Sequence, residues 1–217
     1  MQAVLLAAGR SSRFTSRGFS PFKCLEMVNG ESCLDSTLRF LRSRGVARTV
    51  LVTLDGAPID SDCDFTVRLP DVLPGPAWSA AMATPSLNLA EQTVVADTDG
   101  VFLGLNSSVQ FPEGSFFVTS EYSGPIPEDL VWVENGQPLF KGYVRGLANT
   151  GVYSFSTWET FLRNFSTLET TSPERLVADV LLAVRSRRPP LELDGSVRWL
   201  PCGTPEQLVY ARSHERP

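Results

Sequence analysis

Short apolar runs alternate with an amphipathic segment along the first part of the chain. Residues Gln2–Ala7 and Arg48–Leu54 are nearly continuous runs of Val, Leu and Ala, which is typical of strands buried on both faces of a parallel sheet. Between them, leucines recur at helical spacing over Leu34–Arg44, and Gly45 follows as a stop signal. The order strand, helix, strand indicates an α/β domain.

Shorter runs separated by glycine and proline turns follow, and this pattern is typical of antiparallel strands. The further segments expected to form strands are Phe65–Leu69, Thr93–Ala96, Ser115–Ser120, Leu130–Val133, Gly151–Phe155 and Val197–Leu200. The further segments expected to form helices are Trp78–Ala83, Trp158–Phe165, Arg175–Val184 and a short C-terminal helix opened by Gly203–Leu208. Pro173 is expected in the first turn of the third of these helices. The pattern predicts a mixed central sheet.

Length and charge limit the number of domains and the kind of partner. A chain of 217 residues and 23.8 kDa suffices for one substantial α/β core and is too short for two. We therefore expect a single domain over residues 1–217. The net charge of −5 and the pI near 5.0 provide no basic field for a nucleic-acid backbone, so no nucleic-acid partner is expected.

The cysteines and the apolar segments bear on the compartment. Cys24, Cys33, Cys63 and Cys202 form no Cys-x-x-Cys pair and have no neighbouring histidine, so they indicate neither a zinc site nor a disulfide framework. No apolar segment is long enough to span a bilayer, and the N-terminal run lacks a signal pattern. We expect a cytoplasmic protein with no membrane partner. The single histidine, His214, is a poor candidate for a general base.

The loop after the first strand has the composition of a polyphosphate site. Its small and hydroxylated residues are Ala7, Ala8, Gly9, Ser11 and Ser12. Small residues let backbone N–H groups approach phosphate oxygens, while the cations Arg13 and Lys23 neutralise the remaining charge. The spacing matches neither a Walker loop nor the Gly-x-Gly-x-x-Gly dinucleotide fingerprint.

The order of motifs resembles the nucleotidyltransferases that activate sugar phosphates and amino-alcohol phosphates. The motifs are Ala-Ala-Gly-Arg-Ser-Ser-Arg-Phe over 7–14, Pro-Phe-Lys-Cys-Leu over 21–25, and Asn29-Gly30, a pair that in this family closes a turn before the first helix. The resemblance implies that the loop wraps a nucleoside triphosphate and that Arg13 and Lys23 contact its phosphates. It also implies a Rossmann-like three-layer α/β/α sandwich of the glycosyltransferase A type, with a nucleotide-binding part over 1–110 and an acceptor-binding part over 111–217.

An aspartate pair ends the predicted strand Thr93–Ala96. Asp97 and Asp99 flank Thr98, and carboxylates at the C-terminal end of a buried strand lie where open α/β sheets bind ligands. Such a pair is often only a polar strand end or an Asx turn. In the resembling family this strand ends in an aspartate that binds magnesium, and Asp99 corresponds to it. The resemblance therefore favours a Mg²⁺ site at Asp99 with Asp97 beside it.

A glycine-rich segment resembles the part of the family that lies against the nucleotide base. Within Leu73–Ala80, Gly75 and Ala77 would leave room for a flat ring. Trp78 fits either a wall of that pocket or core packing, which is the commoner fate of a tryptophan at a helix start.

An acceptor site is implied by spacing in the second half. Seven positions after Lys141 the segment Ala148–Tyr153 begins, and together they resemble the family's Glu-Lys and Ala-x-x-Gly-x-Tyr signature. The resemblance implies that Lys141 binds the acceptor phosphate and that the strand with Asn149 lines the acceptor pocket. A lysine beside Gly142 is otherwise an ordinary solvated side chain.

Two positions depart from the family's pattern. Phe140 replaces the glutamate before Lys141, so the acceptor pocket would differ from common sugar-hydroxyl recognition. Pro201 stands near the place where many sugar nucleotidyltransferases carry a second aspartate ligand. Asp97 could supply that ligand, the nucleotide phosphates could complete the site, or activity could be weak.

The leading hypothesis is a magnesium-dependent nucleotidyltransferase. It would couple a triphosphate of the CTP or UTP/dTTP type to a sugar 1-phosphate or an alcohol phosphate such as phosphocholine, releasing pyrophosphate. A glycosyltransferase of the related fold is a second hypothesis, although a nucleotide-sugar donor needs no triphosphate loop. A non-catalytic nucleotide-binding domain is the third. The sequence leaves the base, the acceptor and the oligomeric state open.

Overall fold

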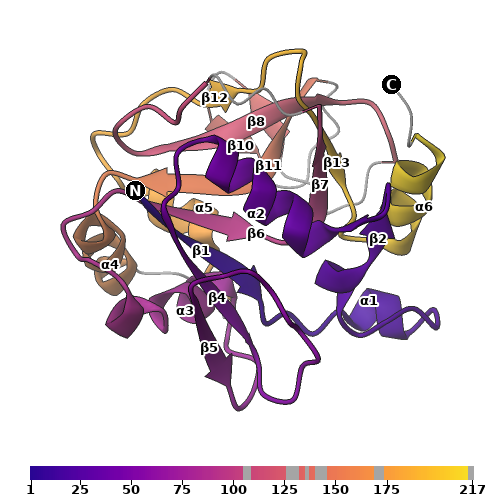
Figure 1. Ribbon diagram of the computed structural model, residues 1–217. Helices are drawn as coiled ribbons and strands as arrows, with labels where there is room; N and C mark the ends of the chain where they lie inside the picture. Colours follow the sequence, from indigo (N-terminus) through magenta and orange to yellow (C-terminus); the bar gives the residue numbers. More distant parts are fainter. Residues whose placement is uncertain (105–108, 126–131, 135–136, 140–145, 169–173, 215–217) are drawn as a thin grey trace.

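The computed structural model describes residues 1–104, 109–125, 132–134, 137–139, 146–168 and 174–214 (Figure 1). Its centre is a nine-stranded sheet whose main path runs β10-β9-β11-β6-β1-β4-β5. The four parallel strands of this path are β1 (Gln2–Ala7), β4 (Arg48–Leu54), β5 (Phe65–Leu69) and β6 (Thr93–Asp97). β1 lies between β4 and β6, so its near-continuous apolar sequence fits burial on both faces.

Antiparallel strands extend the sheet beyond β6. β11 (Gly146–Phe155) pairs antiparallel with β6, with β8 (Phe116–Tyr122) and with β9 (Trp132–Glu134). β10 (Gln137–Leu139) adds to β9, and β12 (Leu191–Glu192) adds in parallel to β8. The predicted mixed sheet is confirmed.

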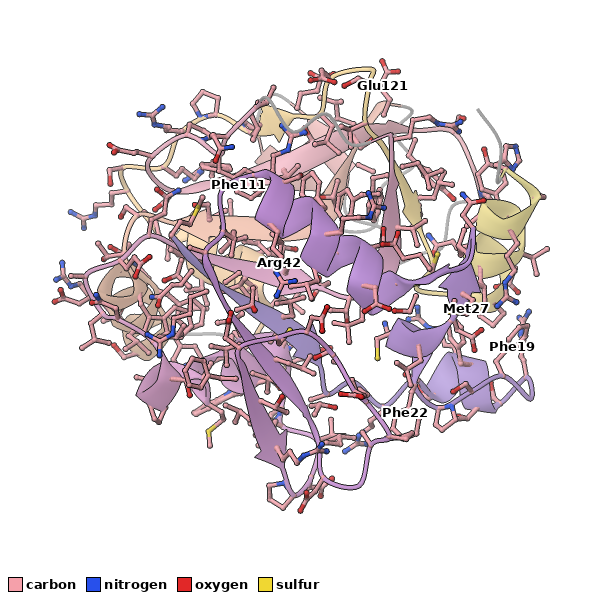
Figure 2. The ribbon with its side chains drawn as sticks, in the orientation of Figure 1. Phe19, Phe22, Met27, Arg42, Phe111 and Glu121 are labelled. Carbon is pink, nitrogen blue, oxygen red and sulfur yellow. The ribbon has the colours of Figure 1, made fainter. Side chains whose placement is uncertain are left out.

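Helices cover both faces of the sheet. α2 (Cys33–Ser43) buries Leu34, Leu38 and Leu41 on one face, and Figure 2 shows Phe111 beside it, where its ring meets Phe40 edge-on at 5.8 Å. On the other face lie α3 (Pro76–Ala81), α4 (Trp158–Thr167) and α5 (Val177–Leu182), packed in a second core cluster. The three-layer α/β/α architecture expected from the sequence is therefore confirmed.

Smaller elements complete the described structure. They are α1 (Ser12–Thr15), the 3₁₀ turns η1 (Lys23–Leu25) and η2 (Thr84–Ser86), the hairpin β2 (Met27–Val28) and β3 (Glu31–Ser32), the ribbon β7 (Gly100–Leu103) and β13 (Arg198–Pro201), and α6 (Pro205–Ser213). In the part of the chain that the structure describes, no helix is long and apolar enough to cross a membrane.

The turn predicted at Asn29-Gly30 joins β2 to β3. Both residues have positive φ, 55° and 75°, as a two-residue hairpin turn of the primed type requires. Ser32 then caps α2, because its hydroxyl accepts a hydrogen bond from the Asp35 N–H at 3.0 Å. The expected turn before the first long helix is thus confirmed.

The predicted elements mostly match, and the clearest error concerns α5. The helix begins at Val177 and not at Arg175, and Pro173, which was expected in its first turn, lies outside the described residues. Before the helix, the Arg175 N–H donates to the Pro74 carbonyl and the Arg175 carbonyl accepts from the Ala77 N–H. These hydrogen bonds hold the backbone of Arg175 against the glycine-rich segment. The helix therefore begins only after Arg175.

Candidate active site

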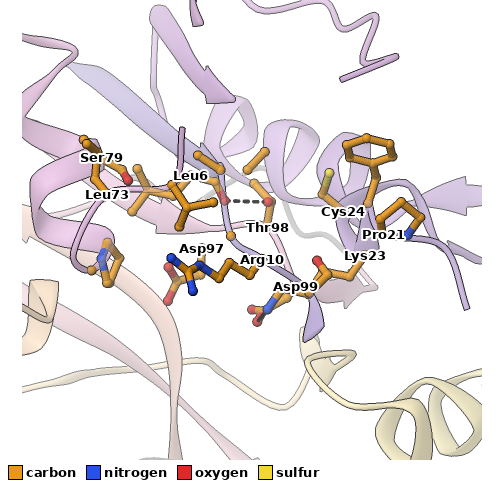
Figure 3. Close-up of a pocket in the computed structure, with 18 of the residues that line it drawn as sticks. Leu6, Arg10, Pro21, Lys23, Cys24, Leu73, Ser79, Asp97, Thr98 and Asp99 are labelled. Carbon is orange, nitrogen blue, oxygen red and sulfur yellow. Dashed lines mark hydrogen bonds and ion pairs between the residues drawn. The ribbon is translucent and has the colours of Figure 1, made fainter. Parts of the chain in front are cut away.

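The carboxyl ends of β1 and β6 bring the predicted loop and the aspartate pair to one edge of the sheet. Leu6 is the register partner of Asp97, and the Thr98 hydroxyl donates to the Leu6 carbonyl at 2.7 Å (Figure 3). This bond fixes the turn between Asp97 and Asp99 beside the loop that follows β1. The two features that the sequence selected therefore share one site.

A cavity of about 560 Å³ lies at this edge, within the range of small-molecule sites. The predicted residues that line it are Ala7, Ala8, Gly9, Ser11, Lys23, Gly75, Asp97 and Asp99. Arg10, Ser79 and Glu174 also line it and were not singled out from the sequence. We call it the first pocket. Figure 3 shows Arg10, Lys23 and both aspartates at its wall.

The geometry of the loop after β1 explains why small residues stand at its start. A Cβ added at Gly9 would meet no atom within 4 Å, so packing within the chain does not require glycine there. Gly9 instead leaves open space at the pocket wall, where a ligand can approach the backbone. Ser11 adopts the left-handed conformation, with φ 47°, and turns the chain into α1.

Lys23 and Asp99 form an ion pair at the centre of the site. Lys23 Nζ lies 2.6 Å from Asp99 Oδ2, and each side chain is 30 % exposed. Lys23 belongs to η1, which buried Cys24 anchors in the core. The ammonium is therefore held in place without a ligand, in a position to meet phosphate oxygens.

Asp97 stands beside this pair, and a glycine lies against each of the two aspartates. A Cβ at Gly151 would lie 2.7 Å from Asp97 Oδ2, and a Cβ at Gly203 would lie 3.1 Å from Asp99 Oδ2. Gly151 has φ +76° and sits where the register of β11 against β8 shifts, so a bulge produces the opening. Burial, with the charge of Asp99 adding to it and Lys23 opposing it, raises the pKa of Asp97 to about 7.

This raised pKa predicts a pH dependence of stability. The Asp97 carboxyl binds its proton more tightly in the folded chain than in the unfolded chain. Its contribution to stability is therefore present at low pH and lost as pH rises from about 4 through about 7. In metal-free protein, Asp97→Asn should flatten the fall in the free energy of unfolding over this range, measured by urea denaturation. Parallel pH profiles for the two proteins would contradict this assignment.

A second cavity of about 220 Å³ adjoins the first. We call it the second pocket, and its lining comes from Arg13, Lys23, Asp97, Asp99, Asn149, Thr150, Gly151, Tyr153, Trp199, Pro201, Gly203, Thr204 and Gln207. Lys23 and the two aspartates line both pockets. Arg13, expected beside the triphosphate, and Asn149, expected in the acceptor pocket, both line the second pocket. Phe140 and Lys141 fall outside the described residues.

The glycine-rich segment is arranged differently from the expectation. Gly75 lines the first pocket, but a Cβ there would come within 2.6 Å of the Arg175 backbone, so close chain packing by itself requires glycine. Ala77 is fully buried in the core and does not line the pocket. Trp78 packs edge-on against Phe165 and under the Arg175 guanidinium, away from the lining residues. Ser12 is exposed and lines neither pocket.

Pro201 stands near the position where related enzymes carry a second aspartate ligand. Pro201 pairs with Gly100 across the β7–β13 ribbon, and the Cys202 N–H donates to the Asp99 carbonyl at 2.6 Å. Among the described residues, no group of three or more His, Cys, Asp or Glu side chains could hold a metal ion. Asp97 and Asp99 are the carboxylates of the described residues that line both pockets.

Comparison with known proteins agrees with this arrangement. Residues 3–108 match the MobA-like NTP transferase domain. No protein of curated function matches the chain in sequence.

Two solved structures share the fold over nearly the whole chain. A nucleoside-diphosphate-sugar pyrophosphorylase from Vibrio cholerae RC9 is 14 % identical, with a TM-score of 0.73 over 97 % of this chain and 100 % of its own. An inositol-1-phosphate CTP transferase from T. maritima is 21 % identical, with a TM-score of 0.70 over 100 % and 98 %. Residues 3–108 are thus similar to the MobA-like NTP transferase domain, and the chain as a whole has the fold of these two nucleotidyltransferase structures.

Proposed function

We propose that the protein transfers a nucleotidyl group from a nucleoside triphosphate of the CTP or UTP/dTTP type to a small phosphorylated acceptor. The observation that carries the proposal is the pair of adjoining pockets that share Lys23, Asp97 and Asp99. The first is large enough for a nucleotide, and the second suits a small metabolite. A reaction between two bound phosphates needs such a shared boundary.

The chemistry requires positioning more than proton transfer. An oxygen of the acceptor phosphate attacks the α-phosphorus and forms a new P–O bond, while the bond from the α-phosphorus to the bridging oxygen breaks. Pyrophosphate leaves with that electron pair. Because the attacking oxygen is already anionic, no side-chain base is needed, and the cations Arg10, Arg13 and Lys23 supply charge neutralisation.

The residues present fit a magnesium ion. Mg²⁺ commonly takes one or two carboxylates and completes its shell with water and substrate phosphates, so Asp97 and Asp99 are a sufficient protein set. The glycines at positions 151 and 203 leave room at the carboxylate oxygens. A cation would offset the burial and the charge of Asp99, which together raise the pKa of Asp97. When bound, the ion would neutralise phosphate charge.

The two other functional classes fit these pockets less well. The nucleotide-sugar donor of a glycosyltransferase carries only a diphosphate. The cations of the loop after β1 would then have no triphosphate to bind. A non-catalytic domain would not need the second pocket. Phosphocholine, sugar 1-phosphates and inositol phosphates all remain within the acceptor class that we propose, and Lys141 stays a predicted acceptor ligand.

The cellular setting that we propose is the cytosol. The four cysteines are free thiols, three of them buried, which suits a reducing compartment. The division into a nucleotide-binding part over 1–110 and an acceptor-binding part over 111–217 stays a prediction.

A pyrophosphate-release screen tests the proposal. CTP, UTP, dTTP, ATP and GTP are each offered with a panel of phosphorylated sugars and alcohols in the presence of Mg²⁺. We expect release with one triphosphate and one acceptor class, dependent on both substrates. Release from a triphosphate alone, at the same rate with and without acceptors, would contradict transfer.

A further inference from the structure

An ion pair occupies the carboxylate that the proposed metal site would use. Lys23 Nζ lies 2.6 Å from Asp99 Oδ2, a distance typical of a strong charge-assisted hydrogen bond (Figure 3). Mg²⁺ binds its ligand oxygens at about 2.1 Å, so an ion on Asp99 would lie very close to this ammonium. Two cations at such a distance repel each other, because little water separates them. The ammonium and a divalent ion therefore compete for Asp99.

Both ends of the pair belong to backbone that is held by contacts of its own. Lys23 begins the 3₁₀ turn η1, and the next residue, Cys24, is buried in the core. The Asp99 carbonyl accepts a hydrogen bond from the Cys202 N–H at 2.6 Å. The two charges are therefore separated most readily by rotation of a side chain. The four-carbon stem of Lys23 makes it the more flexible of the two.

The pockets give the Lys23 ammonium a second place to bind. Lys23 lines both pockets, and 30 % of its side chain is exposed. Phosphate oxygens in the first pocket could accept its hydrogen bonds in place of Asp99. A triphosphate carries several negative charges and also supplies oxygen ligands for Mg²⁺. The empty site and the loaded site thus favour different partners for this lysine.

We propose that Lys23 blocks Asp99 in the nucleotide-free protein, so that the site takes up its divalent ion together with a triphosphate and not before it. The inference rests on the proposed function and adds an order of binding to it. When a triphosphate enters, the Lys23 ammonium turns from Asp99 to the phosphate oxygens and leaves the carboxylate open. The same lysine then excludes the ion from the empty site and binds phosphate in the loaded one.

Manganese binding to the nucleotide-free full chain tests the competition. Mn²⁺ is the probe, because it accepts the same oxygen ligands as Mg²⁺ and its free concentration is measured by electron paramagnetic resonance. Lys23→Met keeps the length of the side chain and removes its charge. We expect this variant to bind Mn²⁺ about tenfold more tightly than the wild type, or better, whereas Lys23→Arg should stay within about twofold of the wild type. The gain should vanish when Asp99→Asn is added to Lys23→Met.

Two matched variants separate the specific contact from the general effect of a lost charge. Arg10→Met removes another cation of the first pocket, whereas the ion pair of Asp99 is with Lys23, so Mn²⁺ binding should tighten by about threefold at most. Arg39→Met removes an ion pair outside both pockets and should change Mn²⁺ binding by less than about twofold. Unchanged or weaker Mn²⁺ binding in Lys23→Met, or an equal gain in Arg10→Met, would overturn the inference.

Addition of a triphosphate tests the order of binding. Wild-type protein with the triphosphate that is active in the pyrophosphate-release screen should hold Mn²⁺ in a protein-bound complex, measured as a faster relaxation of water protons. Wild-type protein that binds Mn²⁺ without a triphosphate as tightly as Lys23→Met does would contradict the order. Tighter Mn²⁺ binding in Lys23→Met, with no pyrophosphate release by the wild type, would support the competition and contradict the proposed function. Pyrophosphate release with unchanged Mn²⁺ binding in Lys23→Met would remove the inference and leave the function standing.

Discussion

Replacing Lys23 by alanine is expected to lower turnover by about 100-fold or more while the chain stays folded. Lys23 lines both pockets, so its ammonium can meet the charge that develops between the attacking and leaving phosphates. Loss of one such contact costs about 3 kcal/mol of transition-state stabilisation. Steady-state pyrophosphate release measures the effect.

The cost in stability should be small, because the Lys23–Asp99 pair is partly exposed and such pairs contribute at most about 1 kcal/mol. The thermal midpoint checks this point. Arg39→Ala is a matched control, since it removes another ion pair, with Glu31, far from both pockets. Wild-type turnover in Lys23→Ala would remove this lysine from the reaction.

Asp99→Asn is expected to weaken triphosphate binding by about tenfold or more in the presence of Mg²⁺, and more than Asp97→Asn does. The sequence resemblance implies that Asp99 is the metal ligand. Asp97, with its pKa raised to about 7, is already partly protonated near neutral pH, and a neutral amide resembles that form. Titration of the triphosphate with and without Mg²⁺, for both variants, measures the difference.

The two variants also separate the ways in which a cation could be held. Asp35→Asn is a suitable control, because it removes an exposed carboxylate at the start of α2, outside both pockets. Equal losses in Asp97→Asn and Asp99→Asn would mean that both carboxylates contribute alike. No loss in either variant would remove the metal site from this strand end.

The parallel core could be predicted because its signals are local. β4 and β5 have the bounds expected from their apolar runs, and β6 extends only one residue further, to Asp97. The site at the strand ends followed from the general rule for open α/β sheets. β7 was missed, since Gly100–Leu103 follows the aspartates directly and pairs with β13 about a hundred residues later.

The parts of the site that escaped prediction depend on contacts distant in sequence. Arg13, expected beside the triphosphate, lines the second pocket, and its neighbour Phe14 packs against α6. Glycine at position 75 suggested space for a base, whereas the backbone of Arg175 lies against it. Neither neighbour can be identified from the local pattern, so the sequence located the loop without dividing its residues between the pockets.

The central claim is that two phosphates are joined at the boundary of the two pockets. Phosphorus NMR of the wild-type chain with Mg²⁺, the active triphosphate and its acceptor tests this most directly. We predict that the acceptor phosphomonoester signal disappears in step with the triphosphate signals, while signals of pyrophosphate and of a new diphosphate diester grow in equal amounts. Formation of inorganic phosphate and a nucleoside diphosphate, with the acceptor signal unchanged, would contradict the account.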